Sequence, residues 1–281
     1  MQPLRFSVSN RFGRQGERPH ERNVGPAVSA FVVAASVFVC VSAGAVVGLF
    51  LRGLLPGHHL GEDTKDVVRL ATGLVATMAA LVLGLLVASA KGSYDAQKSG
   101  LDEITANVTL LDRTLGQYGP AAQEARVILR STVAGAIAKL WPADASAVPT
   151  LGAAETTAGG ESFYARILAL APATDGERVL QAQALRIAAD LAHARLLLVA
   201  QQETAPISAV FLVILTSWLV VLFASFGLFA PRNATVMTAL LIAALSVSGA
   251  VFLILELERP FGGVIQISSA PLRNALAHLG D

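Results

Sequence analysis

The stretch "LATGLVATMAALVLGLLVASA", from Leu70 to Ala90, decides the fold of this protein. It carries no charged side chain, and it has the length of about 20 residues that a helix needs to cross the apolar part of a bilayer. One charge at the centre of such a helix would cost about 2.5–3.5 kcal/mol on insertion scales. Three more uncharged stretches of this kind are Pro26 to Leu51, Pro206 to Ala230 and Ala234 to Leu255. The sequence therefore predicts four transmembrane helices.

The composition of the whole chain agrees with this prediction. Of 281 residues, 54% are hydrophobic and only 15% are charged, whereas soluble domains carry about 25% charged residues. The mean hydropathy is +0.59. The net charge of +1 gives no general attraction for nucleic acid, so we expect none as a partner and expect membrane lipid instead.

The segment between the second and third stretches, residues 91–205, has a different character. Its apolar residues recur at steps of three and four, which is typical of helices with one buried face, and no stretch alternates as a strand would. The fold class is therefore all-α, with a helical bundle inserted between the second and third membrane helices. The same pattern also fits an intermolecular coiled coil. The three apolar faces are Leu101, Ile104, Val108, Leu111 and Leu115; Leu129, Val133, Ala136 and Leu140; and Leu180, Ala184, Ile187, Leu191, Ala194 and Leu198.

Glycine and proline divide this segment. Gly119-Pro120 and Trp141-Pro142 each predict the end of a helix, and the small residues near 142–160 predict a loop. The chain then divides into five regions. They are a basic tail (1–25), the first two membrane helices (26–90), the helical domain (91–205), a membrane helical hairpin (206–257) and a C-terminal segment (258–281).

The basic residues predict the orientation. Five arginines precede the first membrane helix, at positions 5, 11, 14, 18 and 22. Positive residues favour the cytoplasmic side, so we expect both termini and the helical domain in the cytoplasm. The two short connectors then face outward. The second of them is an outer hairpin turn, in which Pro231 cannot continue a helix, Arg232 follows, and Asn233 or Thr235 can cap the next helix.

The sequence contains no constellation that predicts an enzyme. It has neither a glycine-rich phosphate loop nor a nucleophile elbow. The arrangement nearest to a metal site is His58-His59 with Glu62 and Asp63, and no second cluster supports it. We therefore expect no catalytic residue, no metal and no cofactor. The uncharged membrane helices also argue against a proton-coupled transporter, which leaves a passive conduit or no conduit.

Small residues recur on two of the membrane helices. Gly44 and Gly48 form a Gly-x-x-x-Gly pair, and Ala76, Ala80, Gly84 and Ala88 form a stripe with a spacing of four. Such patterns let helix backbones approach closely in lipid, which is the favoured interpretation, and a stripe of this kind can also line a pore.

The last membrane helix ends in "LELERPFGGVIQISSAPLRNAL", from Leu255 to Leu276. Glu256 and Arg259 are spaced to pair at the helix end, and Pro260 stops the helix. Phe261 is then expected to turn back to the membrane interface, and the uncharged segment after it to pack under the bundle.

Four stretches together resemble the bestrophin-like family of bacterial four-span membrane proteins, which is distantly related to bestrophin anion channels. They are "VVRLATGLVATMAALVLGLLVASAKGSYD" (Val67 to Asp95), "LLDRTLGQYGP" (Leu110 to Pro120), "FASFGLFAPRNATV" (Phe223 to Val236) and "LILELERPFGGVIQISSAPLRNAL" (Leu253 to Leu276). The resemblance implies a multi-pass protein of the bacterial inner membrane that assembles as a homo-oligomer, a pentamer by analogy, and conducts anions passively.

By the same analogy the second membrane helix lines the pore, with Thr77, Ala80, Leu81, Gly84 and Ala88 as pore-lining candidates. In bestrophins a Pro-Phe-Gly sequence leads into an acidic run that holds calcium. Here Pro260-Phe261-Gly262 matches its start, and Gly263, Val264 and Ile265 stand where carboxylates would follow, so calcium gating is not expected. The competing hypothesis is a membrane-anchored scaffold or sensor whose cytoplasmic helices bind a protein partner.

Overall fold

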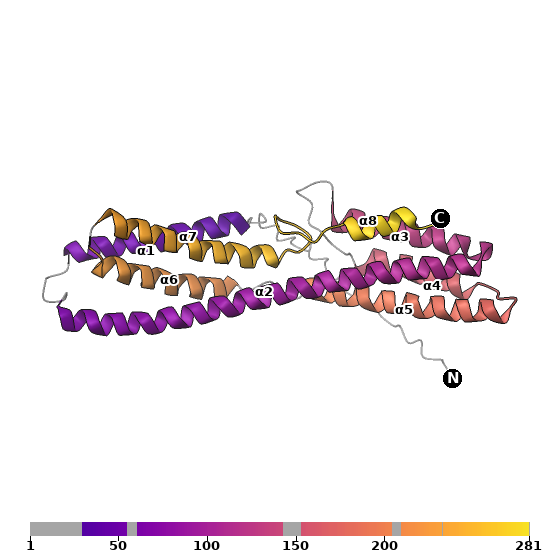
Figure 1. Cartoon of the computed structure of the whole chain (residues 1–281), viewed down its shortest axis with the longest axis horizontal. Coiled ribbons are helices and arrows are strands. Elements are labelled where there is room, and N and C mark those ends of the chain that lie inside the picture. The colour runs from indigo at the N-terminus through magenta and orange to yellow at the C-terminus, as the bar shows by residue number, and fades with distance from the viewer. Residues whose placement is uncertain (1–29, 55–60, 143–152, 204–208, 232, 281) are drawn as a thin grey trace, which may run out of the picture.

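The computed structural model describes residues 30–54, 61–142, 153–203, 209–231 and 233–280. Over these residues the protein is built from helices arranged in two bundles that lie end to end (Figure 1). We call them the apolar bundle, formed by α1, α6, α7 and the first half of α2, and the second bundle, formed by the rest of α2 with α3, α4, α5 and α8. The helices are α1 (Ala30–Leu54), α2 (Glu62–Tyr118), α3 (Gln123–Leu140), α4 (Ala153–Leu168), α5 (Asp175–Glu203), α6 (Ala209–Phe229), α7 (Ala234–Leu257) and α8 (Ala270–His278).

Helix α2 belongs to both bundles (Figure 1). Its 57 residues run without a break, a length of roughly 85 Å at the usual rise per residue. The predicted boundary between residues 90 and 91 therefore lies inside one helix. Gly119 ends α2 with a φ of 102°, which a residue with a side chain rarely adopts, and Pro120 begins a short 3₁₀ turn. The predicted helix end at Gly119-Pro120 is confirmed.

The apolar bundle contains four helices that are long and apolar enough to cross a membrane, as the sequence predicts. The closest approach is between α1 and α6. A Cβ atom at Gly48 would lie 2.0 Å from the carbonyl oxygen of Ala224, and one at Gly227 would lie 2.1 Å from that of Ala45. The two backbones can therefore touch only because these positions are glycine, which is the packing expected for Gly44 and Gly48.

The turn between α6 and α7 forms as predicted, but the two helices do not pack tightly on each other. Asn233 caps α7, because its side-chain oxygen accepts a hydrogen bond of 2.9 Å from the backbone N–H of Val236. Both helices pack mainly on α1. The Ser248 hydroxyl of α7 donates a buried hydrogen bond of 2.5 Å to the carbonyl of Ala34 in α1. The two helices are thus joined by a short turn and share α1 as their main packing partner.

The second bundle has its own apolar core, and the three predicted apolar faces supply about half of its buried residues. Trp141-Pro142 follows the end of α3, as expected. Inside the bundle Arg126 makes a two-pronged ion pair with Asp112, with nitrogen-to-oxygen distances of 2.8 and 2.9 Å. The fully buried large side chains of the core are Leu101, Val108, Leu111, Leu115, Ile167 and Leu198.

The loop predicted near 142–160 is too long. Helix α4 begins at Ala153 and continues to Leu168. The later half of this helix places Phe163 and Ile167 in the core of the second bundle, with Ile167 fully buried. Tertiary packing of an apolar face supplies most of the stability of a short helix, so it overrides the weak helix propensity of the glycines and threonines before it.

Candidate pore-lining face and the junction between the bundles

One face of α2 is left uncovered by the residues that the structure describes. Only 6% of its most apolar window is buried, compared with 22–33% for the other three membrane-length helices. The sequence alone predicts a helix that is apolar on every side, and only the structure shows which side its neighbours leave open. The pore-lining candidates Thr77, Ala80, Leu81, Gly84 and Ala88 are all exposed on this uncovered face, which we call the open face.

Gly84, in the small-residue stripe of α2, makes no close helix crossing with the described residues. A Cβ atom built on Gly84 would find no other atom within 4 Å, and the same holds for Gly73. Thr77 donates its hydroxyl to the Gly73 carbonyl at 2.9 Å, so that donor is satisfied inside the helix. The open face therefore presents small and apolar surface, available to another molecule or to a pore.

The open face continues beyond the apolar bundle, which sequence reasoning did not predict. Residues three, four or seven positions apart lie on the same side of a helix. Counting on in this way from Gly84 and Ala88 reaches further exposed residues of α2, namely Lys91, Asp95, Asp102, Ala106 and Arg113. The sequence did contain a sign that the helix continues, because no proline interrupts it after Ala90. The same side of one helix is thus apolar in its first half and carries charges of both signs in its second half.

Lys91 marks the change from apolar to charged surface. Its ammonium group donates to the Asp95 carboxylate one helical turn further along. It also lies 5.3 Å from the ring centroid of Tyr94, within the range of a cation–π contact. Both side chains of the ion pair are more than half exposed.

The junction between the two bundles is organised by Glu256, near the end of α7. This residue is 5% exposed. Its carboxylate accepts hydrogen bonds from the backbone N–H groups of Val264 at 2.6 Å and Ile265 at 3.3 Å. Gly263 has a φ of 95°, and a Cβ atom there would lie 2.5 Å from the carboxylate oxygen. The backbone of the following loop is thus the partner of Glu256, where the sequence suggested Arg259.

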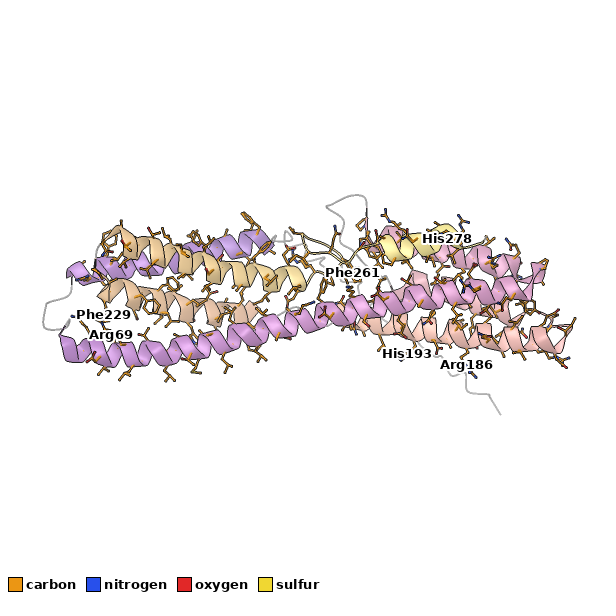
Figure 2. All side chains as sticks on the ribbon, viewed as in Figure 1. Arg69, Arg186, His193, Phe229, Phe261 and His278 are labelled. Carbon is orange, nitrogen blue, oxygen red and sulfur yellow. The ribbon has the colours of Figure 1, made fainter. Side chains whose placement is uncertain are left out.

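Phe261 lies between the two bundles (Figure 2) and is buried. Its ring meets Trp141 edge to face at 5.6 Å, and the Trp141 indole N–H donates to the Ile267 carbonyl at 2.9 Å. The N–H of Ile267 in turn donates to the Pro260 carbonyl at 2.6 Å. The aromatic surface of Trp141 in the second bundle covers Phe261. Of the uncharged segment after it, Ile267 and Leu272 are buried in the core of the second bundle, whereas Val264 is 78% exposed.

The C-terminal residues also dock on the second bundle. Arg130 donates to the Leu279 carbonyl at 2.9 Å, and the Gly280 N–H donates to Asp112 at 3.4 Å. Near the same end of α2, burial first and the negative charge of Glu177 second raise the pKa of the Tyr118 hydroxyl. Sequence reasoning missed these contacts, because they join residues far apart in the chain.

At the outer hairpin turn, Pro231 and Asn233 are exposed, and Arg232 lies outside the described residues. Arg52, near the end of α1, donates to the carbonyl of Ala230 and so ties α1 to this turn. The pair His58-His59 also lies outside the described residues. Within the described part of the chain no group of three or more metal-ligating side chains comes together.

A family model of the bestrophin-like domain matches residues 23–272 of the chain. No curated protein is significantly similar to it in sequence. Crystal structures of a bacterial bestrophin homologue from Klebsiella pneumoniae are similar in fold. One single-residue variant of that protein has a TM-score of 0.66 at 15% identity, covering 89% of this chain and 97% of the other. A second variant has a TM-score of 0.62 at 14% identity, covering 88% and 97%.

Proposed function

This chain belongs to the bestrophin-like family, and we propose that it is a homo-oligomeric membrane channel that conducts anions passively along the open face of α2. The observation that carries the proposal is the exposure of that face. A helix of this apolar character is stable with a wholly uncovered side only where lipid, other copies of the chain or a pore adjoin it. The likeness to bestrophins favours the pore and supplies the preference for anions.

One open face cannot enclose a conduit, so the proposal requires several copies around a symmetry axis. Closed rings of identical chains repeat one contact, and each copy then contributes the same helix to the centre. The family relation favours a pentamer. Small residues such as Ala80 and Gly84 at the axis would let the helices approach closely.

The two halves of the open face would then act differently on a permeating ion. Leu81 is 73% exposed, and a ring of such side chains would form a hydrophobic constriction, which can gate a pore by dewetting. Beyond it, the rings of Lys91, Asp95, Asp102 and Arg113 would surround a wider, charged vestibule. No charged group in the apolar half could carry protons, which fits passive conduction and no enzymatic role.

The arginine-rich residues before position 26 support an orientation with both termini and the second bundle in the cytoplasm of a bacterial inner membrane. Cysteine labelling of whole cells tests it. A membrane-impermeant reagent is expected to react at position 58 or 232 and to spare position 150. The reverse pattern would contradict the orientation.

Reconstitution tests conduction directly. Purified protein in liposomes is expected to release a chloride gradient faster than empty liposomes do, and Leu81→Trp is expected to slow the release by closing the constriction. Gly249→Leu, on α7 and off the open face, is the matched control. Release no faster than in empty liposomes, by protein that is folded and oligomeric, would refute the channel.

A scaffold or sensor is the second candidate, and one observation favours it. Several large apolar side chains are exposed on the second bundle, among them Val127 at 58%, Val179 at 66% and Leu196 at 66%. Exposed apolar surface of this kind marks protein contacts. If the protein does not conduct, this surface is the place to seek a partner by cross-linking in cells.

A further inference from the structure

The second bundle has a cavity of about 720 Å³ between α2, α3, α4 and α5, and this cavity is open to the outside. Its lining combines buried apolar side chains, including Leu101, Val133, Phe163, Ala188 and Leu198, with exposed ones, including Tyr164, Leu168 and Leu196. The volume lies within the range of about 300–1,000 Å³ that is usual for ligand pockets. Because its lining is mostly apolar, burial of an apolar ligand there would be favourable.

The cavity is elongated along the helices. On α5 its lining extends from Ala188 to Leu198, and on α3 from Leu129 to Leu140. Each of these distances is roughly 15 Å at the usual rise per residue. The lining therefore suits an extended, unbranched chain better than a compact ring system.

The main charged group on the lining is Arg195 of α5. Its side chain is half-buried. A Cβ atom at Gly160 of α4 would lie 3.9 Å from its terminal nitrogen, so the guanidinium group reaches the α4 side of the cavity. Burial lowers the pKa of Arg195, yet an arginine side chain remains a cation with five N–H donors. A partly dehydrated cation beside an apolar space favours a ligand with an anionic end.

The other polar groups of the lining have different roles. The Thr132 hydroxyl donates to the Ile128 carbonyl at 2.8 Å. His193 is exposed at the rim (Figure 2). Arg195 is thus the group placed to select the charge of a bound molecule.

We propose that this cavity binds a free fatty acid, whose alkyl chain lies along α5 and whose carboxylate pairs with Arg195. The position of the cavity favours a free fatty acid over a phospholipid of the bilayer. Its first lining residue on α2, Leu101, lies about 16 Å along the helix beyond Ala90, where the apolar run ends. A phospholipid would have to leave the membrane to reach it.

Binding of radiolabelled dodecanoate to the full-length protein in lipid nanodiscs tests the proposal. The dodecanoate that protein-free nanodiscs bind is subtracted. We expect saturable binding of one dodecanoate per chain. Each methylene added from octanoate to dodecanoate should tighten binding up to roughly fourfold, which is the effect of burying that group. Competition with didodecanoyl phosphatidylglycerol separates the two lipid sources, since the proposal expects weak competition.

Two variants locate the site. Arg195→Gln is expected to weaken dodecanoate at least tenfold and to leave dodecanol unchanged, whereas Arg195→Lys retains most of the affinity. Ala188→Phe should block both ligands. Arg186→Gln is the matched control, because Arg186 is exposed on the same helix and is not among the residues that line the cavity.

Three results would overturn the proposal. One is no saturable binding above empty nanodiscs, as expected if a neighbouring copy fills the cavity. Another is equal binding of dodecanoate by the Arg195→Gln variant and the parent protein, when the variant also has the melting temperature of the parent. The third is full competition by the phospholipid, which would make the occupant a membrane lipid. None of these readouts depends on conduction.

Discussion

Gly48 of α1 and Gly84 of α2 stand in similar sequence patterns but in opposite environments. Gly48 lies where α1 crosses α6, and a Cβ atom there would lie 2.0 Å from a backbone oxygen. Gly84 lies on the open face of α2, where a Cβ atom would find nothing within 4 Å. Both glycines recur with another small residue four positions away, which is the pattern of close helix packing in membranes.

The difference teaches that a small-residue stripe predicts a close approach without specifying the partner. At the α1–α6 crossing the partner is another helix of the same chain. At Gly84 of α2 no described residue supplies it, and we propose that the partner is another copy or a pore. The predictions below test this contrast in order of decreasing effect.

The largest effect is expected for Gly48→Leu. The side chain must displace the α6 backbone, and overpacking of this kind costs about 3 kcal/mol or more. We expect little monodisperse protein, with a strongly lowered melting temperature, as measured by fluorescence-detected size exclusion during heating. Gly249→Leu is the control, since its glycine has nothing within 4 Å. A Gly48→Leu variant that is as heat-resistant as the parent would place the crossing elsewhere.

Gly84→Leu is expected to spare the fold of the chain and to disturb its assembly. No atom of the same chain is displaced, so the chain should still insert and fold. If the open faces of several copies surround a narrow pore, the added leucine side chains disrupt the oligomer or block the pore. Anion flux from liposomes then falls at least tenfold. An oligomer of parental size, melting temperature and flux would show that Gly84 faces lipid.

Lys91→Glu is expected to change selectivity with little change in stability. The exposed ion pair with Asp95 contributes about 0.3–0.5 kcal/mol, so the melting temperature should move only slightly. Reversing a ring of charges on the open face should lower the ratio of chloride to sodium permeation in reconstituted protein. Arg186→Glu, exposed on α5, serves as the control. Equal permeation ratios for Lys91→Glu and the parent would remove the second half of α2 from the conduit.

The smallest effect is expected for calcium at the junction between the bundles. Residues 262–269 contain no carboxylate. The carboxylate of Glu256 already accepts hydrogen bonds from the backbone N–H groups of Val264 and Ile265. Tight calcium sites depend on ligand charge. Calorimetric titration into the purified protein should therefore show no tight binding and no shift in melting temperature. Micromolar binding that disappears in Glu256→Gln or Glu258→Gln would show that a calcium site survives with other ligands.

The sequence by itself determined the local features of this protein. Charge-free stretches of sufficient length predicted the four apolar helices, because the cost of a charge in lipid depends on that stretch alone. The ends of α2 and α3 and the Asn233 cap followed in the same way, since Gly119, Pro120 and Pro142 act on their own backbone. The apolar spacing of the second bundle likewise predicted about half of the residues that form its core.

Only the tertiary structure decided which of these surfaces meet. The sequence could not say that Gly48 is covered and Gly84 open, because coverage depends on where α6 and α7 return in space. It paired Glu256 with Arg259 by spacing, whereas the structure gives Glu256 the amides of the following loop. The length of α4 and the cavity beside Arg195 are also products of packing between distant segments. Local chemistry fixes what each helix can bury, and long-range packing selects what it does bury.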